Sequence, residues 1–273
     1  MLECVINISE GRSTTVLDEL ARAGGQSLRD VHSDSFHHRS VYTLIDAPHP
    51  LQRNVRTLIA RAYELIDLTG HVGVHPRFGV VDVVPFVALE PTESTEACVQ
   101  RDQTAQWLSE TFAVPVFLYG PLGPGESRSL PQVRRAEREH ATPNWGPPQS
   151  SPSRGSCAVG CRALLVAWNL WLEGTSLDQA RAIAARLRRP ALRTLAFEVG
   201  PYVQVSCNLV ELTAIRPSQI YDFVLEHLPS GASILRAELV GLAPSALLAR
   251  EEPGRWSQLG LSANSTIEAR LSR

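Results

Sequence analysis

The 273-residue sequence predicts an α+β protein made of two similar α/β sandwich subdomains of β-α-β-β-α-β type, with helices covering the sheets. Runs rich in β-branched residues alternate along the chain with amphipathic segments of helical period. Residues 141–156 are dense in proline, serine and glycine, and they separate two stretches with the same order of predicted elements. We therefore expect an N-terminal subdomain over residues 1–160 and a C-terminal subdomain over residues 161–273.

The first elements follow from short-range patterns. Residues 3–9 form a mostly apolar run that is typical of a strand, and residues 14–23 follow the turn at Gly11 as a predicted helix. Residues 26–34 and 38–46 are two further strand-like runs. Because only a short polar connection joins them, we expect these two strands to form a hairpin.

The remaining elements of the first stretch alternate between helix and strand. Residues 51–66 place six apolar side chains on one helical face: Leu51, Val55, Leu58, Ile59, Ala62 and Leu65. The β-branched run at 79–89 predicts a strand, residues 95–112 predict a second amphipathic helix, and residues 114–120 predict another strand. This alternation favours a sheet that is covered by helices on one face.

The second stretch repeats this order. A strand over 161–174 and a helix over 176–188 come first, followed by a pair of strands around Gly200. A helix is predicted over 217–228, with Pro217 at the first position, where proline is tolerated. A strand over 233–244 completes the set, and Pro244 begins the last helical stretch.

Bulk properties exclude several classes of protein. The net charge of −2 gives no support for a nucleic-acid partner, and the longest apolar runs are too short to cross a membrane. The first residues lack the basic and apolar regions of a signal peptide, so we expect a cytoplasmic protein. The scattered cysteines fit free thiols in a reducing compartment better than a disulfide framework; they are Cys4, Cys98, Cys157, Cys161 and Cys207.

Five of the eight histidines lie between positions 32 and 75: His32, His37, His38, His71 and His75. These side chains can meet, because the predicted hairpin and the glycine-rich turn at 70–79 can both lie at one end of the sheet. Three roles stay open at this point. A metal site is disfavoured because the glycines and Pro76 argue against a helix that would align the ligands. A structural role, or general acid-base catalysis by one imidazole beside Arg77 and Asp82, remains.

Several long motifs resemble one family. The segments "CVINISEGR", "HRSVYTL" and "LIDLTGHVGVHPRFGVVDVVPF" are similar to the opening, a central strand and the most specific motif of the glutamate formiminotransferases. This family includes the N-terminal half of formiminotransferase-cyclodeaminase. The segments "LPQVRRAE", "NWGPP", "GCRALLVAWNLWL", "VQVSCNLVEL" and "AELVGLAP" keep the family's order and approximate spacing. The resemblance thus covers nearly the whole chain.

The resemblance implies two α/β subdomains with a folate-holding groove between them. It implies transfer of a formimino group from N-formimino-L-glutamate to N5 of tetrahydrofolate, the co-substrate, and it suggests a homodimer. The family's catalytic histidine falls on His75. The family's folate-contact segment falls on ten residues: Gly146, Pro147, Pro148, Gln149, Ser150, Ser151, Pro152, Ser153, Arg154 and Gly155.

Other substrate contacts are predicted around His75. Arg39 and Arg77 are candidates for pairing with substrate carboxylates, because a guanidinium can hold a carboxylate through two bonds. For each arginine a surface ion pair is the alternative. His32, His38 and His71 complete the predicted substrate-binding set.

The chain departs from the family pattern at four positions. His32 replaces an acidic residue, His38 an asparagine, Val74 a glutamate and Ala163 a lysine. These changes motivate two alternatives to the transferase. One is a folate-binding family member that acts as an interaction protein without transfer. The other is an amidine or amide hydrolase, in which water replaces the folate amine.

Overall fold

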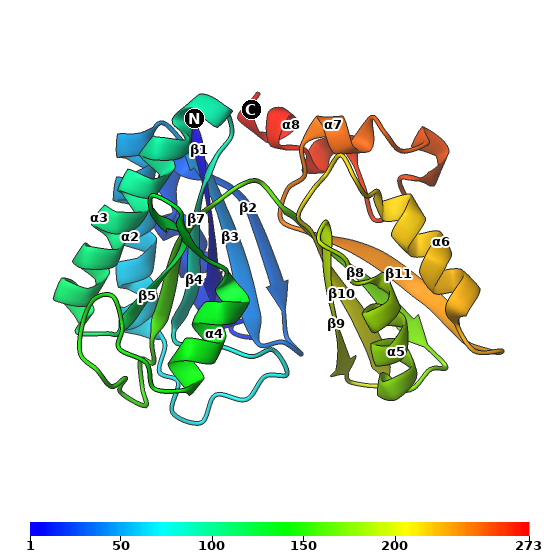
Figure 1. The fold of residues 1–273 in the computed structure, drawn as a ribbon, viewed down its shortest axis with the longest axis horizontal. Helices are drawn as coiled ribbons and strands as arrows, with labels where there is room; N and C mark the ends of the chain where they lie inside the picture. Colours follow the sequence, from blue (N-terminus) through cyan, green and yellow to red (C-terminus); the bar gives the residue numbers. More distant parts are fainter. Residues whose placement is uncertain (273) are drawn as a thin grey trace. The chain divides into compact units, whose positions relative to one another are not determined.

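The computed structural model describes residues 1–272, which form two compact units. Unit 1 is Met1–Leu164, and unit 2 begins at Leu165. Figure 1 shows the order of the helices and strands along the chain. Both units combine a β-sheet with packed helices, which confirms the predicted α+β class.

Unit 1 contains a seven-stranded sheet with the strand order β2-β3-β1-β4-β7-β5-β6. Its strands are β1 (Leu2–Ile8), β2 (Leu28–Asp34), β3 (Arg39–Asp46), β4 (Val81–Ala88), β5 (Val116–Gly123), β6 (Glu126–Arg128) and β7 (Cys157–Arg162). The predicted hairpin is confirmed, because β2 and β3 pair antiparallel. β1 lies antiparallel between β3 and β4, whereas β7 is parallel to both β4 and β5.

Helices cover both faces of this sheet. They are α1 (Thr14–Ala23), α2 (Pro48–Leu65), α3 (Ser94–Phe112) and α4 (Leu130–Arg138). Val116 of β5 belongs to the core beneath the first three helices, while the next residue, Phe117, packs with Val133 of α4. Because successive residues of a strand point to opposite faces, α4 covers the face opposite α2 and α3 (Figure 1). The prediction of helices on one face only was wrong for this unit.

Unit 2 has a four-stranded antiparallel sheet with the order β11-β8-β10-β9. Its elements are β8 (Val166–Glu173), α5 (Leu177–Leu187), β9 (Leu192–Val199), β10 (Tyr202–Leu209), α6 (Pro217–His227), β11 (Ser233–Val240), α7 (Ser245–Leu248) and α8 (Ile267–Leu271). The first four strands of unit 1 have the equivalent order, β2-β3-β1-β4. Each unit therefore contains the predicted β-α-β-β-α-β arrangement, and unit 1 extends its sheet with three more strands.

Two details of the predicted elements differ from the structure. The single strand predicted over 161–174 is in fact two strands, β7 and β8, which lie in different units. The segment 141–156, predicted as the seam between subdomains, precedes β7, and β7 lies between β4 and β5 in the first sheet. This segment is therefore a loop within unit 1.

The cysteines also differ from expectation. Cys98 of α3 and Cys161 of β7 form a disulfide, with their Cα atoms 5.2 Å apart. A separation of 63 residues gave no sequence signal for this pair. Cys4, Cys157 and Cys207 are free and buried. None of the helices in residues 1–272 combines the length and the apolar character needed to cross a membrane.

Candidate active site

Four of the five predicted histidines, His37, His38, His71 and His75, meet at one end of the first sheet, where β3 and β4 begin and β1 ends. Residues 66–80 connect α2 to β4 at this end, and Val74 N–H donates to Phe36 O of the β2–β3 turn at 3.2 Å. The rings of His38 and His71 stack with centroids 4.0 Å apart, and His37 and His75 lie edge to face at 5.7 Å. The prediction that the hairpin and the glycine-rich turn converge is confirmed.

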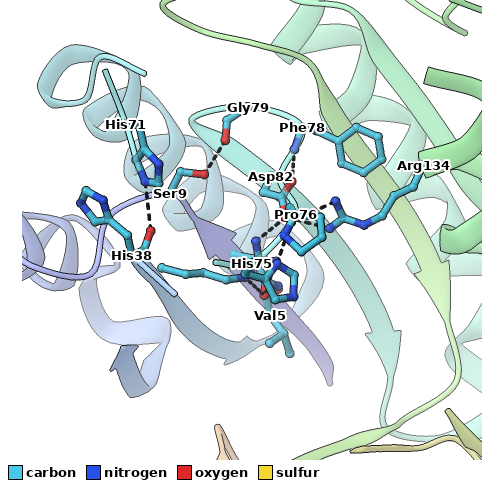
Figure 2. Close-up of polar contacts among 12 residues, drawn as sticks. Val5, Ser9, His38, His71, His75, Pro76, Phe78, Gly79, Asp82 and Arg134 are labelled. Atoms are coloured by element: carbon cyan, nitrogen blue, oxygen red, sulfur yellow. Dashed lines mark hydrogen bonds and ion pairs between the residues drawn. The ribbon is translucent and has the colours of Figure 1, made fainter. Parts of the chain in front are cut away.

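His75 is partly buried and held by its own segment. Its Nδ1 lies 2.6 Å from Pro76 O, and since a carbonyl oxygen only accepts, Nδ1 carries the proton (Figure 2). The lone pair of the neutral ring is therefore on Nε2. Burial and the nearby Arg39 lower the pKa of His75 from 6.5 to about 3, with Arg134 adding to the effect and Asp82 opposing it. The ring is neutral at pH 7 in the unliganded protein.

Asp82 is the buried acceptor at the centre of the site. Its carboxylate accepts from Phe78 N–H, from Arg39 Nη1 and from Arg134 Nη2, the last at 2.9 Å. The side chain of Asp82 is fully buried. Burial alone would raise the pKa of Asp82, but Arg39 and Arg134 hold it below its ordinary value. Asp82 is thus an ionised partner for two guanidinium groups.

Arg134 was not among the predicted site residues, although its segment "LPQVRRAE" resembles the family; α4 brings its side chain into the site. Its Nη1 donates to Pro76 O at 3.2 Å, and its guanidinium lies 4.5 Å from the centre of the Phe78 ring. Figure 2 shows Arg134 reaching both Pro76 and Asp82. Two signals could have pointed to Arg134: the family-like segment that contains it and the capping sequence at the start of α4.

Backbone packing and backbone conformation explain the glycines around His75. A side chain at Gly73 would place Cβ 2.4 Å from His37 O, and one at Gly79 would place Cβ 2.2 Å from Ser156 O. Gly70 has a φ of 82°, which favours glycine. The glycine-rich turn thus packs closely against the β2–β3 turn and against the end of the loop that leads into β7.

The predicted folate loop runs beside the segment that carries His75. Val80 N–H donates to Arg154 O at 2.9 Å, Ser156 N–H donates to Phe78 O at 3.0 Å, and Leu68 N–H donates to Ser153 O at 2.9 Å. Residues 146–155 and residues 68–80 are therefore joined by backbone hydrogen bonds. A cavity of about 260 Å³ lies against this loop; its lining includes Pro148, Gln149, Ser150, Phe117, Glu137 and His140.

The other predicted substrate-binding residues make contacts within the chain. His38 Nδ1 lies 3.1 Å from Val72 O, and His38 Nε2 lies 3.2 Å from a carboxylate oxygen of Glu10. His71 Nε2–H donates to His38 O at 3.1 Å, and Arg77 donates to His71 O at 2.7 Å. These contacts favour the structural role that the sequence left open for His38 and His71.

Arg39 lies beside the buried Asp82, whereas His32 lies on strand β2. Arg39 pairs with the buried Asp82 and donates to Asn7 Oδ1 at 2.9 Å, so its ion pair is internal rather than on the surface. His32 lies on β2, opposite Val41 of β3. Within residues 1–272, no three His, Cys, Asp or Glu side chains are grouped closely enough to hold a metal ion.

The fold and this site define an α+β protein whose first unit presents a neutral imidazole among arginine side chains at the end of a sheet. Residues 1–162 match the formiminotransferase domain, N-terminal subdomain. The chain is 31% identical to glutamate formimidoyltransferase of Streptococcus pyogenes serotype M1 over 271 residues, covering 91% of this chain and 90% of that protein. The equivalent enzyme of Thermoplasma acidophilum is also 31% identical, over 91% of this chain and 89% of its own length.

A longer relative matches over only part of its length. The formimidoyltransferase-cyclodeaminase of Gallus gallus is 32% identical over 89% of this chain, which spans 50% of that protein. The protein belongs to the formiminotransferase family. This membership confirms the resemblance that the motifs indicated.

Proposed function

We propose that the protein transfers a formimino group from N-formimino-L-glutamate to N5 of tetrahydrofolate, with His75 as the general acid and base. Its membership of the family and two relatives named glutamate formimidoyltransferase support this reaction. The observation that carries the role of His75 is its tautomer: Pro76 O holds Nδ1–H, so Nε2 can accept a proton.

The proton balance of the reaction suits a single imidazole. N5 of tetrahydrofolate attacks the amidine carbon and forms a tetrahedral adduct, and Nε2 of His75 takes the proton that N5 loses. The imidazolium then gives this proton to the glutamate nitrogen as the bond between that nitrogen and the amidine carbon breaks. Glutamate leaves, and the formimino group stays on N5. Proton transfer by a positioned imidazole contributes roughly 100- to 10,000-fold to such a rate.

The charges around His75 fit an anionic donor. In the unliganded protein, burial and Arg39 keep the pKa of His75 near 3, which is too low for an effective base at pH 7. A substrate carboxylate bound close to Arg39 offsets its positive charge and raises the pKa of His75. The base therefore becomes effective when the donor is in place.

The binding residues form two groups in this proposal. Arg39, Arg77, His32, His38 and His71 contact or shape the site of formiminoglutamate. The loop over residues 146–155 binds the folate, and its backbone hydrogen bonds to residues 68–80 support this placement beside His75.

The test is an assay with purified protein, tetrahydrofolate and formiminoglutamate in which glutamate release is followed. We expect His75→Gln to lower kcat by roughly 100-fold or more, because the proton acceptor is lost. His49→Gln is the matched control, since His49 is an exposed histidine of α2 in the same unit. Equal rates for the wild type and His75→Gln would remove His75 from the mechanism.

The same assay separates the other functions that the sequence allowed. Glutamate release without folate would identify a hydrolase. Folate binding in calorimetry without turnover would identify a binding protein. We further propose a cytoplasmic homodimer, as the family resemblance suggests; cell fractionation and light scattering on the purified protein test these two statements.

A further inference from the structure

Arg134 is an arginine of α4 that reaches across to the segment carrying His75. The side chain is only 17% exposed although it lies on a helix with several charged residues. Its guanidinium has three described contacts: Asp82 at 2.9 Å, Pro76 O at 3.2 Å and the face of the Phe78 ring at 4.5 Å. The contacts hold the backbone on both sides of Arg77.

One of these contacts is shared with His75. Pro76 O accepts from His75 Nδ1–H at 2.6 Å and from Arg134 Nη1 at 3.2 Å. The carbonyl that selects the tautomer of the ring is therefore itself fixed by Arg134. Asp82 provides a second anchor, because it accepts from Phe78 N–H as well as from Arg134. Of these two hydrogen bonds to Pro76 O, loss of Arg134 would leave the one from His75 Nδ1–H, and the carbonyl that orients the ring would no longer be held by Arg134.

We propose that Arg134 is a positioning residue for the transfer reaction: through Pro76 O and Asp82 it holds His75 with Nδ1 protonated and the lone pair on Nε2. The contribution to catalysis rests on the proposed function of His75. The placement of the His75 ring does not depend on that function, because the tautomer can be measured without substrates.

The charge of Arg134 has a second effect on the same ring. Four charged or titratable groups face His75: Arg39 from β3, His37 from the β2–β3 turn, Asp82 from β4 and Arg134 from α4. After burial and Arg39, Arg134 also lowers the pKa of His75, whereas Asp82 raises it. Removing the charge of Arg134 therefore raises the proton affinity of His75 in the unliganded protein.

Two variants separate position from charge. Arg134→Gln removes both the bridge and the charge, while Arg134→Lys keeps the charge but cannot supply the planar fork that reaches two acceptors. Arg135→Gln is the matched control, because Arg135 is an exposed arginine on the same helix. Nitrogen-15 NMR of the imidazole groups reports the tautomer and the titration, and His75→Gln assigns the His75 signals.

In the wild type and in Arg135→Gln we expect the Nδ1–H tautomer of His75. In Arg134→Gln we expect a mixture of tautomers and a rise of roughly one unit in the pKa of His75. In Arg134→Lys the tautomer is mixed while the pKa stays close to that of the wild type. For the reaction, both Arg134 variants should lower kcat roughly 10- to 100-fold with little change in KM, as expected for a misplaced base.

The proposal is overturned if Arg134→Gln keeps the wild-type tautomer and titration curve of His75. A KM effect without a kcat effect would also overturn it, because Arg134 would then bind substrate instead of positioning the base. Circular dichroism of each variant shows whether α4 and the unit remain folded, and Arg134→Lys keeps the test decisive if Arg134→Gln unfolds. If the NMR changes appear but the wild type transfers no formimino group, the ring placement stands and the proposed function fails.

Discussion

Replacement of Asp82 by asparagine tests whether the buried carboxylate stabilises unit 1. In the structure Asp82 is fully buried, and the side chains of Arg39 and Arg134 are 13% and 17% exposed. Asparagine keeps the shape of the side chain but leaves two nearly buried guanidinium groups without a counter-charge. Breaking a buried ion pair in this way costs about 3–5 kcal/mol, and the residual exposure of both arginines places our expectation near about 3 kcal/mol.

Native-state hydrogen exchange is the suitable assay, because the slowest amides of β1 and β4 report the free energy of opening of unit 1 alone. Glu19→Gln is the control within the same unit: its ion pair with Arg61 is solvent-exposed, so we expect a much smaller loss than for Asp82→Asn. The folded-state pKa of Asp82 is depressed below its ordinary value of 3.8, so its contribution is fully present above that value and is lost as the pH falls further, through the folded-state pKa. The reasoning is refuted if Asp82→Asn costs no more than Glu19→Gln at pH 7.

Three further predictions concern other parts of unit 1. Burial raises the pKa of Glu3 from 4.5 to about 7, so unfolding between these pH values releases a proton and the stability of unit 1 falls as the pH rises. At pH 8, Glu3→Gln should therefore be up to about 3 kcal/mol more stable than the wild type. The reasoning is contradicted if the stability difference between Glu3→Gln and the wild type is no larger at pH 8 than at pH 4. Gly73→Ala should displace residues 70–79 from the β2–β3 turn and lower kcat, since its Cβ would lie 2.4 Å from His37 O; an unchanged kcat would show that the turn can move at no cost. Reduction of the Cys98–Cys161 disulfide should lower the stability of unit 1 by about 2–4 kcal/mol in urea unfolding, and a Cys98→Ser protein should lose its sensitivity to reductant.

Local patterns predicted most of the fold, because most elements have a regular apolar spacing. The helix α2 buries five of the six residues assigned to its apolar face: Leu51, Val55, Leu58, Ile59 and Ala62. By contrast, α4 has only nine residues and a single fully buried one, Val133, among several charges, so its apolar pattern is short. Its capping box at Ser129 and Gln132 and the proline at position 131 were the readable signs of a helix start. The short strand β7 was merged with β8 because only a few residues separate them.

The candidate site could be predicted only in part. The convergence of His38 and His71 follows from topology, since a hairpin turn and a helix–strand connection can lie at the same end of a sheet. Spacing could not show that Asp82 pairs with Arg134, because 52 residues and an unrecognised helix separate them. The stacking and backbone contacts that give His38 and His71 structural roles also depend on the tertiary structure. Such contacts follow from packing and leave no periodic mark in the sequence.

The backbone bridge between Gly79 and Gly155 links the proposed folate loop to the segment that carries His75. If the loop shifts when a pterin docks, the shared hydrogen bonds carry that shift to the imidazole. The ring of His75 would then reach the position that the proposed reaction needs only after the folate has bound, which favours an ordered kinetic scheme with folate binding first. In such an order, a dead-end analogue of folate inhibits competitively against folate and noncompetitively against formiminoglutamate, whereas a dead-end analogue of formiminoglutamate inhibits uncompetitively against folate.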